Sequence, residues 1–237
     1  MFLFGSMFGY PFWQKMAGSP EDQARLIRSN PAAALCKTAR FIEDPSGKSI
    51  AVISDGSGIT SVALSLLGAE VTLFGSSEGV EQYARELAEA AGVPMRVMIV
   101  KPEEIDLEQF GEQFDIVYPE GAVLHFNENL RRAVKTLKGL LKPGGKLVVG
   151  IYPPDANLAR IMFFDQPGLL RPEEADYMKA QIMGAGEMPL MVLEKNNAPA
   201  ILAHTMGLFH DFDFKILLDD EDVQGIQRLI ATKDIDS

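Results

Sequence analysis

A short glycine turn is the feature of this sequence best placed to bind a ligand. Gly56, Ser57 and Gly58 follow Asp55 and an apolar run, and a helical pattern begins directly after them. A strand, a tight glycine loop and a helix N-terminus present backbone N–H groups to a ligand. The spacing therefore predicts a nucleotide-binding unit over residues 50–75.

Few side chains of this sequence are suited to acid–base or metal chemistry. His125 is the candidate general base, because a histidine titrates near working pH; a packed or solvent-bonded histidine is the alternative. His204 and His210 are six positions apart, which does not match the spacing of metal ligands on one element, and Cys36 is the single cysteine. We therefore expect no metal site, and we expect Cys36 to lie in the core.

Strands and helices must alternate around the glycine turn to position these residues. Apolar runs predict strands at 50–54, 70–74, 95–100, 114–118 and 146–151. Helical periodicity predicts helices at 59–67, 79–91 and 127–141, with a short piece near Leu107. Continuous apolar runs suit strands that are covered on both faces, so this order predicts an α/β fold with a mostly parallel sheet.

The N-terminal region is predicted to be helical. The segment Ser19-Pro20-Glu21-Asp22 is a capping box with proline at the first helical position, and it opens a helix ending near Arg28. A second helix is expected over 32–42, before the first strand of the sheet. The aromatic residues Tyr10, Phe12 and Trp13 either cover a pocket or pack against the body of the protein.

The C-terminal region predicts strands at 212–219 and 226–231. Their short connection makes them an antiparallel hairpin. The domain organisation that follows is an N-terminal helical segment or lid (1–48) and an α/β domain (49–237), in which 155–196 form an inserted lid or cap.

Composition limits the classes of partner. The chain has 237 residues, 47% of them hydrophobic, and a formal net charge of −11, which disfavours a nucleic-acid partner. No run is long enough to span a membrane, and one cysteine fits a reducing compartment, so a cytoplasmic protein is predicted. The sequence indicates no oligomeric state.

Four segments, in order and spacing, resemble motifs of the class I S-adenosylmethionine-dependent methyltransferases. They are GAEVT (68–72), QFDIV (113–117), EGAVLH (120–125) and KPGGKL (142–147). The resemblance covers residues 49–152 and resumes loosely at 199–233. It implies a Rossmann-like, mostly parallel sheet with a C-terminal antiparallel hairpin and helices on both faces.

The resemblance also implies S-adenosylmethionine as the cofactor and a role for each loop. Residues 55–58 would lie against its methionine part, the end of the second strand would hold the ribose, and 101–104 would flank the adenine. Residues 119–126 would face the transferred methyl group and its acceptor. The cofactor-binding residues implied are Asp55, Gly56, Ser57, Gly58, Gly75, Ser76, Glu103 and Glu120.

The sequence departs from the family pattern at four positions. Val52 stands where the family has an acidic residue, and Ser54 stands where it has the first loop glycine. Gly75 and Lys101 replace the acidic residues expected near ribose and adenine. A hydrogen bond to a charged group contributes about 1.5–3 kcal/mol, so each loss could weaken binding by about 10- to 100-fold.

Nearby polar residues are candidates to compensate. Asp55 could receive the methionine amino group, although a helix N-cap is the alternative for it. Ser76 or Ser77 could bond the ribose, or else cap the following turn. Glu103 or Glu104 could replace the carboxylate near adenine.

Three functions remain open from the sequence. The first is an S-adenosylmethionine-dependent methyltransferase acting on a small, largely uncharged molecule. The second is a catalytically degenerate methyltransferase-fold protein that binds or interacts without catalysis. The third is a dinucleotide-dependent enzyme, because residues 56–61 nearly match G-x-G-x-x-G; Asp55 beside the loop would repel a pyrophosphate.

Overall fold

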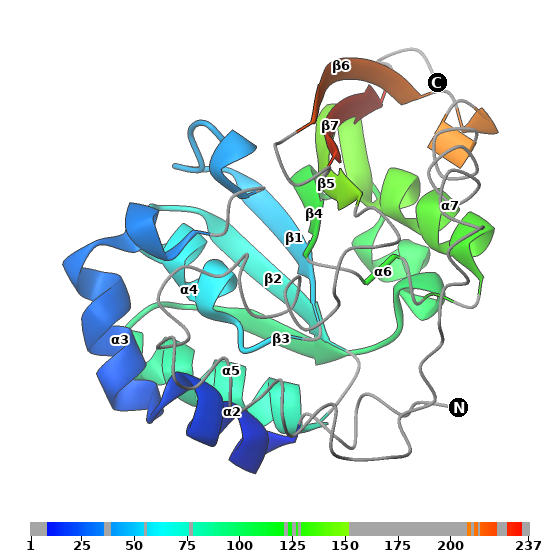
Figure 1. Ribbon diagram of the computed structural model, residues 1–237. Coiled ribbons are helices and arrows are strands. Elements are labelled where there is room, and N and C mark those ends of the chain that lie inside the picture. The colour runs from blue at the N-terminus through cyan, green and yellow to red at the C-terminus, as the bar shows by residue number, and fades with distance from the viewer. Residues whose placement is uncertain are drawn as a thin grey trace.

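A single sheet with helices on both sides organises the part of the chain that the structure describes (Figure 1). The computed structural model describes residues 9–35, 39–54, 56–75, 78–120, 123–124, 127, 129–151, 208–209, 211–212, 214–221 and 227–233. Its strands are β1 (Ser49–Ile53), β2 (Glu70–Gly75), β3 (Arg96–Ile99), β4 (Phe114–Pro119), β5 (Leu141–Ile151), β6 (Phe214–Glu221) and β7 (Gln227–Lys233). Its helices are α2 (Tyr10–Ala17), α3 (Pro20–Ser29), α4 (Ile59–Leu66), α5 (Glu78–Ala91), α6 (Leu107–Phe110) and α7 (Leu130–Leu140), with 3-10 turns η1 (Pro31–Ala34), η2 (Ala39–Phe41) and η3 (Pro102–Glu104).

The strand order across the sheet is β3-β2-β1-β4-β5-β7-β6. The pairs from β3 to β5 are parallel, and β7 runs antiparallel to both β5 and β6. The predicted α/β class, with a mostly parallel sheet and a C-terminal antiparallel hairpin, is confirmed. Since β2 and β3 extend to one side of β1 while β4 and β5 extend to the other, the winding reverses between β1 and β4. Open α/β sheets bind ligands outside the carboxyl ends of the strands at such a reversal.

Strand β1 is buried on both faces. Ile50 and Val52 belong to a core cluster that includes residues of α2, α3, α4 and α5. Ala51 and Ile53 belong to a second cluster, which includes residues of α6 and α7. Figure 1 shows these two groups of helices on opposite sides of the sheet. Alternate side chains of one strand therefore enter two cores, as the continuous apolar run predicts.

Most predicted elements lie within a few residues of the observed ones. The helix predicted at 127–141 begins later, at Leu130, because Asn129 is its N-cap: the Asn129 side chain accepts a hydrogen bond from the Arg132 amide at 3.2 Å. The predicted cap of α3 is confirmed, since the Asp22 amide donates to Ser19 Oγ at 3.2 Å.

The N-terminal region differs from its prediction in two places. Helix α2 is not predicted by the sequence pattern, yet Trp13 is buried and the ring of Tyr10 lies 5.8 Å from that of Tyr83 on α5. The predicted helix over 32–42 is wrong: 3-10 turns stand at both of its ends, and Leu35 is extended at φ −71° and ψ 133°. An extended residue cannot continue the i to i−4 hydrogen bonds of an α-helix. Cys36 lies outside the described residues.

Strand β5 begins at Leu141, five positions before the predicted start at Lys146. Phe114 pairs with Leu141 and Ile116 with Lys146, so the intervening residues of β5 bulge out opposite Asp115. Gly144 accommodates this bulge with a φ of 74°. The predicted turn is therefore an irregularity inside a longer strand.

The bulge allows Lys142 to connect three strands at the amino end of the sheet. Lys142 Nζ lies 2.8 Å from Asp115 Oδ1 and 3.1 Å from Ser49 Oγ. Asp115 Oδ2 accepts from the amide and the hydroxyl of Ser49, both at 2.8 Å. This cluster lies at the opposite edge from the carboxyl ends of the strands, so we assign it to stability.

The lowered pKa of Asp115 predicts that the protein loses stability in acid. Partial burial raises the pKa of this carboxyl, but the Lys142 ammonium and the Ser49 donors lower it more, so the pKa lies below its ordinary value of 3.8. The stabilisation is then present above the unfolded-state pKa and is lost as the pH falls through the lowered folded-state pKa.

We expect urea unfolding to show Asp115→Asn less stable than the wild type at about pH 6, by less than about 1 kcal/mol because the pair is partly exposed. The difference should shrink towards about pH 3, as the wild-type carboxyl takes up a proton. A difference that is equal at both pH values would contradict this account.

Candidate functional site

The carboxyl ends of β1 and β4 meet at the reversal in the sheet. Ile53 pairs with Pro119, and the next residue of each strand, Ser54 and Glu120, extends beyond this pair. The Glu120 amide donates to the Ile53 carbonyl at 2.9 Å, and the Ser54 amide donates to the Phe74 carbonyl of β2 at 3.0 Å. Backbone pairing thus fixes both residues in the place where the fold predicts a ligand.

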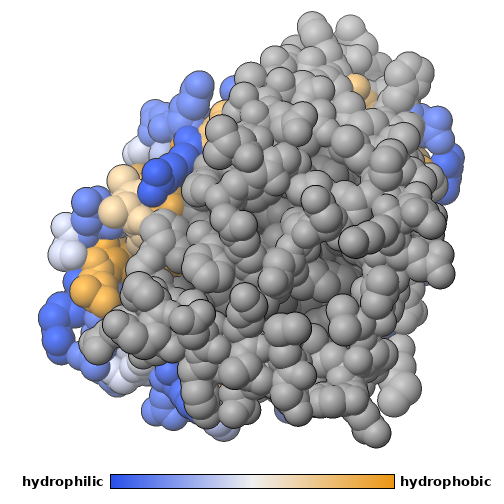
Figure 2. Space-filling model, in the orientation of Figure 1, coloured by the Kyte–Doolittle hydropathy of each residue, from blue (hydrophilic) through white to orange (hydrophobic). Residues whose placement is uncertain are grey.

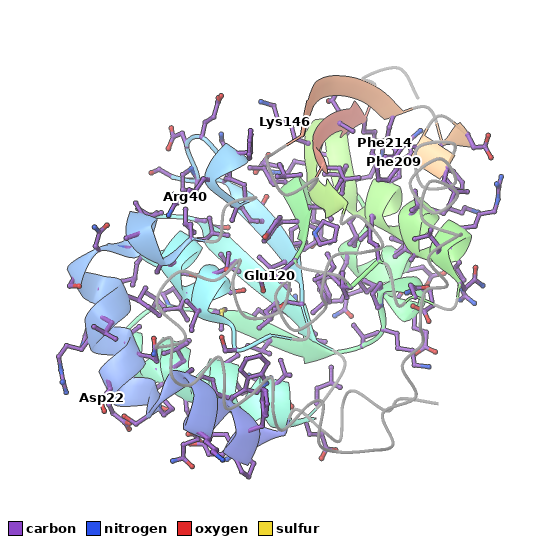
Figure 3. All side chains as sticks on the ribbon, in the orientation of Figure 1. Asp22, Arg40, Glu120, Lys146, Phe209 and Phe214 are labelled. Atoms are coloured by element: carbon purple, nitrogen blue, oxygen red, sulfur yellow. The ribbon has the colours of Figure 1, made fainter. Side chains whose placement is uncertain are left out.

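Glu120 is a buried carboxylate, 7% exposed, that is bonded by two hydroxyl groups. Ser54 Oγ donates to Glu120 Oε2 at 2.5 Å, and Thr60 Oγ1 donates to Glu120 Oε1. The Gly56 amide in turn donates to Ser54 Oγ at 2.9 Å. One network therefore joins β1, the glycine loop, the first turn of α4 and the end of β4. Figure 3 shows Glu120 in the middle of the molecule.

The last glycine of the loop has a packing role. Gly58 is the N-cap of α4 in the left-handed region, with a φ of 79°. A Cβ atom placed on it would lie 2.7 Å from the Cβ of Ala84 on α5, so only glycine allows α4 and α5 to approach this closely. The N-cap alternative for Asp55 is wrong, because Gly58 holds that position in α4.

The hydroxyl of Ser57 is a buried polar group within the same loop. Ser57 is fully buried, and its Oγ has no hydrogen-bond partner among the residues that the structure describes. Ser61, in the first turn of α4, is also buried, and its Oγ has no partner in the described part of the chain. An unsatisfied buried hydroxyl is costly, and such groups in folded proteins often mark a place that a water or ligand completes.

The end of β2 lies beside the end of β1 and helix α5. A Cβ on Gly75 would lie 3.4 Å from both the Ser54 carbonyl oxygen and Val80 Cγ1. The Gly75 carbonyl accepts from the Val100 amide at 2.8 Å as part of the sheet. Glycine therefore stands where the family carries a ribose carboxylate, and a Cβ there would make only ordinary van der Waals contacts with these two atoms. Ser76 and Ser77, the suggested substitutes, lie outside the described residues.

The turn after β3 joins the segment that precedes α7. Glu103 Oε2 accepts from Asn127 Nδ2 at 2.7 Å, and Asn127 Oδ1 accepts from the Asn129 amide at 2.8 Å. Lys101 Nζ lies 3.8 Å from Glu104 Oε1. Glu103 therefore positions Asn127 in this structure, and its predicted contact with a cofactor remains a prediction.

The structure brings only part of the predicted site together. Gly56, Ser57, Gly58 and Glu120 lie around one network, and Gly75 borders it through Ser54. Asp55, His125, His204 and His210 lie outside the described residues. Val52 is fully buried in the core, so the missing acidic residue of β1 is replaced by apolar packing.

Sequence reasoning missed the role of Ser54 and Thr60. Ser54 reads as a lost glycine, yet its hydroxyl orients Glu120. The available signal is positional: Ser54 follows β1 and Glu120 follows β4, and both are polar residues directly after buried strands.

The surface of the described part of the chain carries scattered apolar side chains. The large exposed ones are Leu26 on α3, Ile99 on β3 and Leu107 on α6. Figure 2 shows mainly hydrophilic colours, with smaller apolar areas, where described residues reach the face in view. Within the described residues, no helix has the length and apolar character needed to cross a bilayer, and no three potential metal ligands are grouped together there.

Residues 53–149 match the family model described as a methyltransferase domain. A stretch of 76 residues is 33% identical to an uncharacterised protein of Methanocaldococcus jannaschii, covering 32% of this chain and 35% of that protein. The match therefore spans about a third of the length of that relative.

Solved structures with the same fold cover nearly all of the chain. A protein of echinomycin biosynthesis, linked to the conversion of a disulfide bond into a thioacetal group, is 18% identical with a TM-score of 0.64, covering 99% of this chain and 94% of that one. An S-adenosylmethionine-dependent methyltransferase of Aquifex aeolicus is 13% identical with a TM-score of 0.55, covering 90% and 97%. Magnesium protoporphyrin IX methyltransferase of Synechocystis, solved with bound S-adenosylhomocysteine, is 17% identical with a TM-score of 0.52, covering 94% and 87%.

The fold is that of the class I S-adenosylmethionine-dependent methyltransferases, and the resemblance seen in the sequence is confirmed. The segment that matches the methyltransferase domain, residues 53–149, runs from the last residue of β1 through β2, β3 and β4 to most of β5. The predicted cofactor, S-adenosylmethionine, agrees with the match to the methyltransferase domain and with the S-adenosylhomocysteine bound in the Synechocystis enzyme.

The residues at the switch point fit this cofactor in part. The Ser57 hydroxyl has no partner within the described ranges, and the Glu120 carboxylate lies beside the glycine loop. The described residues at the end of β2 supply no acidic side chain for the ribose, since Gly75 stands there. The fit is therefore strongest at the methionine end of the cofactor.

Proposed function

We propose that the protein is an S-adenosylmethionine-dependent methyltransferase that acts on a small molecule. The observation that carries this proposal is the polar network of Ser54, Thr60 and Glu120 at the reversal between β1 and β4. It lies where an open α/β sheet binds ligands, within the segment that matches the methyltransferase domain.

The chain's own residues would bind and align the reactants. Bound S-adenosylmethionine would supply a methyl group on a sulfonium, which reacts by in-line displacement. Gly56 and Ser57 would hold its methionine end, and Glu103 and Asn127 would support the adenine side from the turn after β3. Such a site mainly contributes alignment and exclusion of water. His125 remains the predicted base for an acceptor that must lose a proton.

Isothermal titration calorimetry tests the proposal directly. We expect the wild-type protein to bind S-adenosylhomocysteine, and we expect ligand at about 100 times its Kd to stabilise the fold by about 2.7 kcal/mol. Methyl transfer from labelled S-adenosylmethionine to a panel of small acceptors would then report activity. Absence of binding at millimolar ligand would contradict the proposal.

Binding without catalysis is a second candidate function. Val52 in the core and Gly75 at the end of β2 remove two acidic residues of the family pattern, which favours this alternative. It predicts cofactor binding with no methylated product from any acceptor in the panel. A methylated product would exclude it.

A further inference from the structure

Gly75 is the last residue of β2 and lies directly beside the polar network of the site. Its neighbour Phe74 pairs with Ile53 of β1, and the Phe74 carbonyl accepts from the Ser54 amide at 3.0 Å. On its other side Gly75 pairs with β3. Because Ser54 also donates to Glu120, the end of β2 is held next to the residues that carry the proposed function.

The fold does not require a glycine at position 75. A Cβ placed there would make only ordinary van der Waals contacts, at 3.4 Å from the Ser54 carbonyl oxygen and from Val80 Cγ1, and the φ of Gly75 lies outside the left-handed region. Gly79 in α5 is different, because a Cβ there would lie 2.5 Å from Gly9 Cα at the start of α2. Packing thus explains Gly79 but does not explain Gly75.

The position of Gly75 matters for the recognition of a ribose. In nucleotide-binding α/β sheets, an acidic residue about 20 positions after the glycine loop bonds the ribose 2′-hydroxyl. Gly75 stands at this distance from Gly56 and provides no side chain. The two residues that follow in the sequence, Ser76 and Ser77, carry no charge either.

The next acidic residue in the sequence, Glu78, is explained by helix α5. Glu78 is the first residue of that helix and is exposed. A carboxylate in the first turn of a helix interacts favourably with the positive end of the helix dipole. Water around an exposed carboxylate also competes with a ribose for its hydrogen bonds.

The lack of a carboxylate limits how strongly the site distinguishes sugars. A hydrogen bond to a charged group corresponds to about 10- to 100-fold in affinity, and one between neutral groups to about 2- to 10-fold. A ligand that lacks the 2′-hydroxyl therefore forfeits much less affinity at a neutral position than beside a carboxylate.

We infer that Gly75 is a specificity-determining residue, and that it lets the protein accept a nucleoside ligand with a 2′-deoxyribose almost as well as one with a ribose. The preference for ribose is then at most about 10-fold, the contribution of one neutral hydrogen bond. This inference rests on the proposed function, because it takes the ligand to be S-adenosylmethionine or its product.

Calorimetry with S-adenosylhomocysteine and its 2′-deoxy analogue, which lacks only the ribose 2′-hydroxyl, tests the inference. We expect the two Kd values of the wild type to differ by less than about 10-fold. Gly75→Asp supplies a carboxylate, so it should raise this ratio of Kd values by a further 10- to 100-fold or so, about one hydrogen bond to a charged group. Gly75→Asn, of the same size but uncharged, should raise it by less than about 10-fold.

The comparison of the two ligands in the wild type does not depend on whether a variant folds. A wild-type preference for ribose well above about 10-fold would overturn the inference and leave the proposed function in place. A Gly75→Asp variant that folds but keeps the wild-type ratio would also overturn it. A wild-type protein that binds neither ligand would overturn the proposed function as well.

Two further variants check the steps of the inference. Gly75→Ala should leave the urea midpoint of unfolding unchanged, because the added Cβ meets no close neighbour, and a lower midpoint would mean that packing requires the glycine. Glu78→Gln should leave the ratio of the two Kd values unchanged. A lower ratio in that variant would show that α5 supplies the ribose carboxylate, which would overturn the role of Gly75.

Discussion

Replacing Ser54 by alanine and Thr60 by valine together will lower the free energy of unfolding by about 3–6 kcal/mol, because a hydrogen bond to a charged group contributes about 1.5–3 kcal/mol. Both hydroxyls donate to Glu120, which is buried. Without them, a carboxylate removed from water loses two of its donors. The Gly56 amide also loses its acceptor. Urea unfolding followed by circular dichroism measures the change.

Two further variants assign the loss to the buried charge. Ser65→Ala also removes a hydroxyl from α4, but that hydroxyl donates to the Ser61 carbonyl at 3.0 Å, so we expect a cost below about 1.5 kcal/mol. Adding Glu120→Gln to the double variant should recover part of the stability, since a neutral amide costs less to bury than a carboxylate. A typical neutral hydrogen bond contributes about 1 kcal/mol. A double variant whose free energy of unfolding lies within about 1 kcal/mol of the wild type would therefore contradict the role of this network. An absence of recovery with Glu120→Gln would also contradict it.

The sheet was largely predictable because each strand has a local sequence signal, a short run of apolar residues. Runs such as Ala51 to Ile53 are apolar without interruption, which suits a short strand covered on both faces. Helix α2 was not predictable in the same way. It is short and flanked by Gly9 and Gly18, and its stability comes from contacts with α5, such as the hydrogen bond from Tyr10 to Glu86. Tertiary contacts of this kind leave no local periodicity in the sequence.

In the candidate site too, the features with a local sequence signal were predictable and those that depend on tertiary contacts were not. The glycine loop was predictable, because its composition and position after a strand are local features. The partnership of Ser54 with Glu120 was not, because the two residues are 66 positions apart and meet only through the pairing of β1 with β4. Reading β1 alone makes Ser54 a defect. Reading β1 and β4 together, in the register that the sheet imposes, makes it a donor to a buried charge.

Replacing Gly58 by alanine should be the second most costly change, at about 2–5 kcal/mol from backbone strain and overpacking together. Gly58 has a φ of 79°, which L-residues with a side chain rarely adopt. Its added Cβ would also lie 2.7 Å from Ala84 Cβ, closer than two carbon atoms can pack. The free energy of unfolding from urea titration measures the sum of the two effects.

A second glycine separates strain from steric overlap. Gly92 has a φ of 71°, and a Cβ placed on it would meet nothing within 4 Å, so Gly92→Ala reports backbone strain alone. We expect Gly58→Ala to exceed Gly92→Ala by about 1–3 kcal/mol, the usual cost of overpacking. Adding Ala84→Gly to Gly58→Ala should remove part of that excess, which a double-mutant cycle would detect as coupling. Equal losses of unfolding free energy for Gly58→Ala and Gly92→Ala would mean that α4 moves away from α5 at no cost in stability. A helix that moves so readily could not hold Thr60 against Glu120, and the polar network would lose its rigid support.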